Sequence, residues 1–96
     1  MKDEFKPDLQ VRIISPKGII LSSKAFWVSS KNNQGSFDIL PFHANFITFI
    51  ENSPVTVKKA DNQTETFNFI FAIIHNLNNN VNIYTELTHP IRIAKA

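Results

Sequence analysis

The sequence predicts an all-β fold, an antiparallel β-sandwich of about eight to ten short strands, and two observations support this prediction. Apolar residues recur at every second position along most of the 96 residues, which is the period of a strand with one buried face. Clusters of Asn, Asp, Gly, Pro and Ser separate these runs at short intervals, as turns do in sandwiches and barrels. We therefore expect one domain over residues 9–96, preceded by an N-terminal extension over residues 1–8.

The first predicted strands are joined by a short turn. Leu9, Val11 and Ile13 alternate with polar residues and predict the first strand. The segment SPKG at residues 15–18 predicts the turn, because Pro and Gly adopt the dihedral angles that turns require. A second alternating run then extends over residues 19–28.

The middle of the chain contains a second turn and three further runs. The cluster NNQGS at residues 32–36 predicts the turn, because Asn and Gly tolerate positive φ. Strands are then expected at residues 37–40 and 46–50, on either side of Pro41, and at residues 55–57.

Residues 64–74 form the longest predicted strand, after a hairpin loop at residues 60–63. Its centre is apolar on both faces, which predicts a central core strand; the alternative is that one face packs against a partner chain. Alternation places Phe67, Phe69, Phe71 and Ile73 on one face and Ile70, Ala72 and Ile74 on the other.

The last part of the chain contains one more predicted turn and two short predicted strands. A turn at residues 78–80 precedes a strand containing Val81 and Ile83, and a short final run contains Ile91 and Ile93. No helical pattern follows this run, so no C-terminal helical domain is expected.

Composition excludes several classes of protein. Hydrophobic residues make up 43% and charged residues 19%, which is too apolar for a disordered chain and too polar for a membrane protein. No apolar run approaches the roughly 18 residues of a membrane-spanning helix. The net charge is only +2 and the lysines are scattered, whereas nucleic-acid binders concentrate basic residues on one face. We expect a globular domain that binds no nucleic acid and does not insert into a membrane.

The sequence contains no recognisable set of catalytic or metal-binding residues. Cysteine is absent, and the three histidines lack the short spacings of a zinc site. The only glycines, Gly18 and Gly35, cannot supply a dinucleotide fingerprint or a phosphate-binding loop. No serine lies in a nucleophile-elbow pattern. We expect no catalytic site, no metal and no cofactor.

A resemblance to a known family adds to this interpretation. The segment GSFDILPFHANFITFI at residues 35–50 resembles the region of ATP synthase ε subunits usually written like GELGILPGHAPLLTAL. The segment LQVRIISPKGIIL resembles the first hairpin of the same family, and the similarity extends from Leu9 to Glu86. The matching positions in the central block are Gly35, Ile39, Leu40, Pro41, His43, Ala44 and Thr48.

Several positions depart from the family pattern. Phe42 replaces the glycine after the proline, Asn45 replaces a proline, and Ser36 replaces the usual acid. The segment Phe71–Ile73 replaces Ser-Gly-Gly in the long strand. These changes are typical of a diverged member of the family, because the alternation of apolar residues survives all of them.

The resemblance implies a non-catalytic β-sandwich in the central stalk, or rotor, of an F-type ATP synthase. Such a subunit binds γ, helps couple its rotation to the ring of c subunits, and meets the α3β3 head only indirectly. Catalysis belongs to other subunits, and the subunit lies peripherally on the cytoplasmic side of the membrane. The family's C-terminal helical hairpin has no counterpart in this sequence.

Two alternatives to this role stay open. One is an ε-like subunit of an F1-like motor that is not coupled to an ion ring, which the loss of the acid at Ser36 favours. The other is a stand-alone β-barrel module that binds oligosaccharide or nucleic acid.

Two sets of residues are expected to contact partners. The resemblance implies that a turn, together with one histidine, faces the c ring or another rotor partner. The long strand is expected to provide core residues or a γ-facing surface. The rotor-facing set is Asn33, Gln34, Gly35, Ser36 and His43, and the γ-facing or core set is Phe69, Ile70, Phe71 and Ile74.

Overall fold

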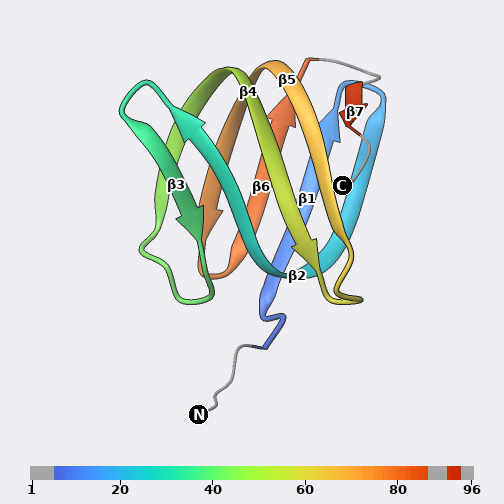
Figure 1. Ribbon diagram of the computed structural model, residues 1–96, viewed down its shortest axis with the longest axis vertical. Helices are drawn as coiled ribbons and strands as arrows, with labels where there is room; N and C mark the ends of the chain where they lie inside the picture. The colour runs from blue at the N-terminus through green and yellow to red at the C-terminus, as the bar shows by residue number, and fades with distance from the viewer. Residues whose placement is uncertain (1–5, 87–90, 94–96) are drawn as a thin grey trace.

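The computed structural model describes residues 6–86 and 91–93, and every regular element among them is a strand (Figure 1). The all-β class that the sequence predicts is therefore confirmed. Three of the seven strands are 14 or 15 residues long and bend. They are therefore longer than the short strands that the sequence predicts. The strands are β1 (Leu9–Ser15), β2 (Gly18–Asn32), β3 (Gly35–Ile39), β4 (Phe46–Lys59), β5 (Thr64–Leu77), β6 (Asn80–Thr85) and β7 (Ile91–Ile93).

The strands form one sheet that closes on itself. Its order is β1-β6-β5-β4-β2-β3, and β1 also pairs with β2, which closes the sheet into a barrel-like sandwich. β7 pairs with β5 outside this path. All neighbours are antiparallel except β1 and β6, which are parallel. Closure removes most of the unpaired edge that an open sheet would expose.

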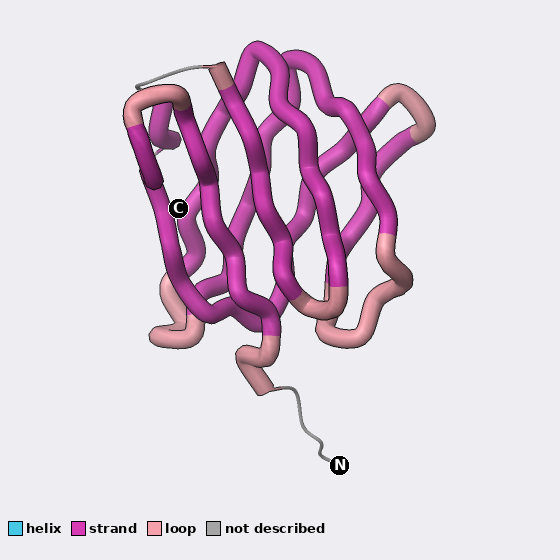
Figure 2. Tube along the Cα trace, turned by 180° about the vertical axis from the view of Figure 1, so that it is seen from behind, coloured by secondary structure: helices cyan, strands magenta, loops and turns pink. Residues whose placement is uncertain are grey.

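The closed sheet is flattened into two layers (Figures 1 and 2). Layer A contains β1, β6, the start of β2, the first half of β4 and the second half of β5. Layer B contains the end of β2, β3, the second half of β4, the first half of β5, and β7. β4 and β5 thus pass from one layer to the other as a pair, over the upper end of the molecule in Figure 1.

The two long strands change faces where they bend. On β4, Glu51 and Asn52 are both exposed, between buried Ile50 and buried Ser53. The backbone of Asn52 has a φ of 48°, a left-handed conformation that Asn adopts more readily than most residues. The pairing of β4 with β5 keeps its register through this point. The face that points inward therefore shifts by one residue on both strands at the same level.

This shift corrects the predicted faces of the long strand. Phe67 and Phe69 are buried in the core, as their alternation predicts. Phe71 is only half-buried and Ile73 is 41% exposed, so the prediction that these four side chains share one face is wrong. After the bend, alternate residues from Ala72 onward point inward instead.

The core lies between the two layers and receives side chains from β1 to β6. Phe67 and Phe69 are its largest members, and their rings lie 6.2 Å apart between centroids. Burying an aliphatic or aromatic side chain of this size contributes about 1.5–3 kcal/mol. The buried hydrophobic residues are Leu9, Val11, Ile13, Ala25, Val28, Ile39, Ile50, Val55, Val57, Phe67, Phe69, Ala72, Ile74, Val81 and Ile83.

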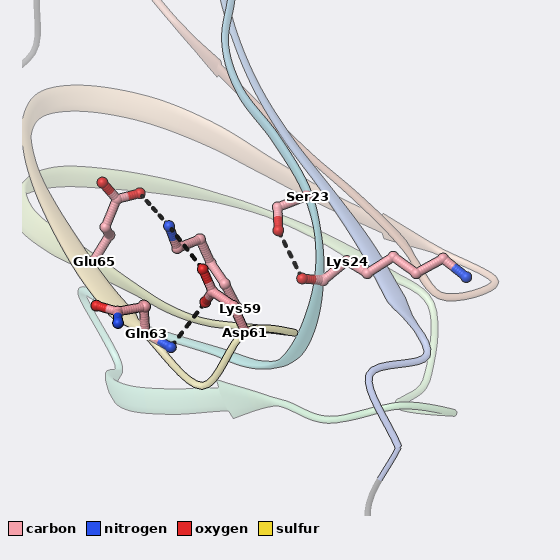
Figure 3. Close-up of polar contacts among 6 residues, drawn as sticks. All are labelled: Ser23, Lys24, Lys59, Asp61, Gln63 and Glu65. Carbon is pink, nitrogen blue, oxygen red and sulfur yellow. Dashed lines mark hydrogen bonds and ion pairs between the residues drawn. The ribbon is translucent and has the colours of Figure 1, made fainter.

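An ion-pair cluster fastens the hairpin between β4 and β5 (Figure 3). The Nζ atom of Lys59 lies 3.5 Å from Oε1 of Glu65 and 3.9 Å from Oδ2 of Asp61. The next residue, Ala60, donates its N–H to the carbonyl oxygen of Lys24 on β2 at 2.9 Å. The hairpin is thereby held against the bend of β2, at the lower end of the sandwich in Figure 1.

Candidate functional site

A row of apolar side chains crosses the outer face of layer A. The register makes its members direct cross-strand neighbours, running from β4 through β5, β6 and β1 to β2. Four of the five are 41–60% exposed, although they are large aliphatic or aromatic residues. This apolar row consists of Phe49, Ile73, Tyr84, Ile14 and Ile19.

Further apolar side chains extend the row along β4 and β5. The ring of Phe71 stacks on that of Phe49, with centroids 5.9 Å apart and planes 29° apart. Ile47, beside the row on β4, is 67% exposed, and Ile70, 60% exposed, lies at the bend, where it continues the outward alternation of Asn68. Contiguous apolar surface of this kind, formed from several strands, is typical of a face that a partner covers.

The outer face of layer B has the opposite character. Its cross-strand row consists of Thr66, Thr56, Ser29 and Asp38, on β5, β4, β2 and β3. The hydroxyl groups of Thr56 and Thr66 are 3.0 Å apart, and the Ser29 hydroxyl donates to Oδ1 of Asp38. We call this set the hydroxyl row. Its polar groups are hydrogen-bonded within the sheet, so this face is stable in contact with water.

The residues predicted to be γ-facing or core separate into two pairs. Phe69 is 1% exposed and Ile74 is fully buried, so both belong to the core. Ile70 and Phe71 lie outside, at the bend beside the apolar row. Sequence reasoning missed most of the apolar row, because its members lie on five strands and only the pairing register aligns them.

The predicted rotor-facing residues do not form one site. Residues 33–36 form the turn between β2 and β3 and the start of β3, whereas His43 lies beyond the other end of β3 (Figure 1). β3 spans Gly35–Ile39, which is about 13 Å at about 3.3 Å per residue. The turn is tight, because Asn32 Oδ1 accepts the Gln34 N–H at 2.8 Å and Gly35 has a φ of 123°.

A groove connects the turn with the apolar row. The amide of Asn32 donates to the Thr48 hydroxyl on β4 at 2.9 Å, which bridges the turn to layer A. Beside this bridge lies a groove of about 540 Å³, lined by Asn33 on one side and by Ile47 and Phe49 on the other. A partner on the apolar row can therefore also reach the turn that contains Gln34 and Ser36.

His43 belongs to a loop that is tied to the end of β5. Its backbone N–H donates to the carbonyl oxygen of Leu40 at 3.0 Å, and its ring lies 5.1 Å from that of Phe46. The buried amide of Asn76 donates to the carbonyl oxygens of His43 and Ala44, at 3.3 and 3.0 Å. Through these contacts, the backbone and ring of His43 form part of the folded loop between β3 and β4.

Within residues 6–86 and 91–93, no three His, Asp or Glu side chains gather as metal ligands. None of the described residues forms a helix long and apolar enough to cross a membrane. The site features that the structure shows are the apolar row, the hydroxyl row and the groove beside the turn between β2 and β3.

Comparison with known families identifies the domain. Residues 8–89 match the family model for the ATP synthase, Delta/Epsilon chain, beta-sandwich domain. The chain is 29% identical over 58 residues to the ATP synthase epsilon chain of Sulfurimonas denitrificans, covering 60% of this chain and 45% of that one. It is 33% identical over 67 residues to the chloroplastic epsilon chain of Mesostigma viride, covering 68% and 50%. The chain thus spans about half the length of these curated relatives.

Solved structures show the same fold at low sequence identity. A chain in the central stalk/c-ring structure of the Tetrahymena thermophila mitochondrial ATP synthase superposes with a TM-score of 0.71 at 16% identity, covering 88% of this chain and 67% of that chain. A chain in the Euglena gracilis mitochondrial ATP synthase structure of OSCP, F1 and c-ring gives 0.78 at 13%, covering 96% and 57%.

Proposed function

The chain belongs to the family of the ATP synthase delta/epsilon chain β-sandwich domain, and from this membership we propose that it is a non-catalytic ε subunit in the central stalk of an F-type ATP synthase. In this role the sandwich binds γ and helps to couple its rotation to the c ring. It lies peripherally on the cytoplasmic side of the membrane. ATP hydrolysis takes place in the α3β3 head, which this chain meets only indirectly.

The apolar row is the observation that supports a stalk role most directly. A free sandwich gains nothing from large apolar side chains aligned on its outer face, whereas a partner that covers them removes their surface from water. Specific stable interfaces bury roughly 800 Å² per partner, which requires a surface formed from several strands. We assign this face, with Phe71 and Ile70 beside it, to γ.

A matched pair of charge substitutions on the two faces tests this assignment. Ile73→Asp places a carboxylate in the centre of the apolar row, and Asn68→Asp places one at an exposed strand position on the opposite face. With γ co-expressed and the complex measured by size-exclusion chromatography and calorimetry, Ile73→Asp should weaken binding at least tenfold, about 1.4 kcal/mol. Asn68→Asp should leave it unchanged.

Two results would contradict the assignment. If both variants bind γ like the original chain, the apolar row is not the γ-facing surface. If the original chain does not bind γ at all, the stalk role itself fails, and a stand-alone binding module becomes the better interpretation.

The turn between β2 and β3 is the proposed contact with the rotor. Residues 33–36 project from one end of layer B and offer neutral hydrogen-bonding groups. Ser36 stands where the family usually has an acid, which favours the second candidate, an ε-like subunit of an F1-like motor without an ion ring. His43, at the other end of β3, is not expected to share this contact.

Cysteine trapping separates the two candidates. The chain has no native cysteine, so Gln34→Cys or Ser36→Cys introduces a single thiol. With a second cysteine placed in the loop of a candidate partner and an oxidant added, the two thiols lose two protons and two electrons and form a disulfide, but only where the two Cα atoms lie within about 7 Å. Disulfides to c subunits in the assembled complex support an ion-coupled synthase. Disulfides solely to another protein support the F1-like motor.

A further inference from the structure

Phe42 combines two features that are costly for an isolated domain. It lies in the loop of residues 40–45 between β3 and β4, and 81% of its surface is exposed, the largest fraction among the described large hydrophobic residues. Its backbone has a φ of 67°, a left-handed conformation that disfavours every residue with a large side chain. A strained and exposed aromatic residue of this kind indicates a role outside the fold.

Asparagine side chains hold this loop in place. The Phe42 N–H donates to Oδ1 of Asn79 at 2.7 Å, and the Asn78 N–H donates to Oδ1 of Asn45 at 2.8 Å. The buried amide of Asn76 donates to two further carbonyl oxygens of the loop. The loop is therefore fastened to the turn between β5 and β6, and the ring is presented on ordered backbone, which lowers the entropic cost of binding a partner.

The loop of residues 40–45 and the turn of residues 77–80 carry one titratable side chain, His43. Neither residues 40–45 nor residues 77–80 contain Asp, Glu, Lys or Arg. The segment that leads into β1 lies at the same end (Figure 1), because the Gln10 N–H donates to the carbonyl oxygen of Asn79, and its two charged residues, Lys6 and Asp8, have opposite charges. Attraction to an anionic lipid surface depends on clustered Lys and Arg, so this end does not suit a membrane. It suits an uncharged protein surface.

Two apolar side chains on the outer face of layer A lie toward this end, alongside the polar cross-strand neighbours of Ile47, which are His75, Asn82 and Arg12. Ile47 is 67% exposed on the first half of β4, and Leu77 is 46% exposed at the end of β5. Both lie on the outer face of layer A, between the apolar row and the turn that holds Phe42. One partner can therefore cover the row and reach the ring.

We propose that Phe42 is an aromatic anchor in the interface with γ, and that it inserts into an apolar pocket on an uncharged part of the γ surface. The inference rests on the proposed function, because it extends the γ-facing surface from the apolar row to the loop of residues 40–45. Aromatic side chains that enter a partner's pocket account for a large share of binding energy in many interfaces. Phe42 then determines specificity, because a γ subunit without that pocket binds the row alone.

Site-specific photocrosslinking in the assembled complex tests the location. p-Benzoylphenylalanine is placed at Phe42, at Phe49 in the apolar row, and at Asn68 on the opposite face as a control. Positions 42 and 49 should both crosslink to γ, and position 68 should not. The yield at position 42 should change by less than about twofold between roughly 0.05 and 0.5 M salt, because an uncharged contact is not screened.

The possible outcomes separate this inference from the proposed function. A γ product at position 49, with a lipid product, another subunit or no product at position 42, overturns the anchor and leaves the stalk role standing. A yield at position 42 that falls tenfold with salt overturns the uncharged contact. Failure at both positions overturns the assignment of this face to γ together with the anchor, whereas a chain that does not assemble with γ at all overturns the proposed function.

Two substitutions distinguish an anchor from a structural residue. Glycine accepts a φ of 67° without strain, so Phe42→Gly should lower the Tm of the free domain by no more than about 2 °C, and Phe42→Ala should behave similarly because the ring is exposed. Both should weaken γ binding at least tenfold. A Tm loss above roughly 8 °C in both variants, or unchanged binding, overturns the proposal.

Discussion

The two outer faces of the sandwich are built in part by the same two strands, yet they differ completely in character. The first half of β4 and the second half of β5 contribute Phe49 and Ile73 to the apolar row. The second half of β4 and the first half of β5 contribute Thr56 and Thr66 to the hydroxyl row. A single strand therefore has no single outer face, and the surface that it presents changes where it crosses between layers.

The bend at Asn52 produces this difference. Because both strands shift their inward face by one residue at the same level, side chains that simple alternation would bury are placed outside. Phe71 and Ile73 would continue the core face of Phe67 and Phe69 in a straight strand. The bend instead places them outside the core, without any change in the pairing of the strands.

The largest expected loss of stability comes from a comparison of two neighbouring isoleucines, which are identical in size. Ile74 is fully buried and Ile73 is 41% exposed on the apolar row. Ile74→Ala leaves a cavity in the core and should cost about 2–5 kcal/mol of unfolding free energy. Ile73→Ala removes contacts that are already partly hydrated and should cost less than about 1 kcal/mol.

Urea denaturation of the free domain measures both values on the same scale. Equal losses for Ile73→Ala and Ile74→Ala would show that the strand does not change faces at the bend. The distinction between core and exposed residues after the bend would then be lost.

Much of the fold follows from the sequence, because alternation and turn residues act locally. The turns at residues 15–18 and 32–36, and the hairpin loop at residues 60–63, were each predicted from Gly, Pro, Asn or Asp within a few positions. The all-β sandwich follows from these turns together with the period of two. The family resemblance carried by residues 35–50 agrees with the family model that matches residues 8–89.

The candidate site was predicted less well, because it depends on register and bending. The apolar row requires five strands to be aligned, and no local pattern gives the pairing of Tyr84 with Ile14 across parallel neighbours. The faces of residues 70–74 depend on the left-handed Asn52, which lies on a different strand. His43 and Gly35 are near in sequence, but the length of β3 separates them.

A smaller effect is expected at the bend itself. Asn52→Val forces a β-branched residue into a left-handed backbone and should cost about 1–2 kcal/mol, which corresponds to a Tm loss of about 4–16 °C for a domain of this size. Asn52→Gly, which accepts the same φ, should stay within about 0.5 kcal/mol of the original chain, because relief of strain offsets the greater entropy of the unfolded state.

An exposed asparagine in extended backbone provides the control for the bend. Asn68→Val on β5 should be neutral or slightly stabilising, because β-branched residues favour strands. If Asn52→Val is as well tolerated as Asn68→Val in thermal unfolding, the left-handed residue does not determine the change of faces.

The smallest effect is expected on the hydroxyl row, where the sheet satisfies its own polar groups. Thr56 and Thr66 share one half-buried hydrogen bond, and a typical bond of this kind contributes about 0.5–1.5 kcal/mol net. Thr66→Val removes the bond but supplies a side chain of similar shape and higher strand preference, so the net loss should be below about 1 kcal/mol. A double-mutant cycle with Thr56→Val should give a coupling of about 0.2–1 kcal/mol.

The affinity for γ should not change in any of the three variants, because this face lies on the other side of the sandwich from the apolar row. A tenfold loss of γ binding in Thr66→Val would reverse the comparison and identify the hydroxyl row as the partner-facing surface.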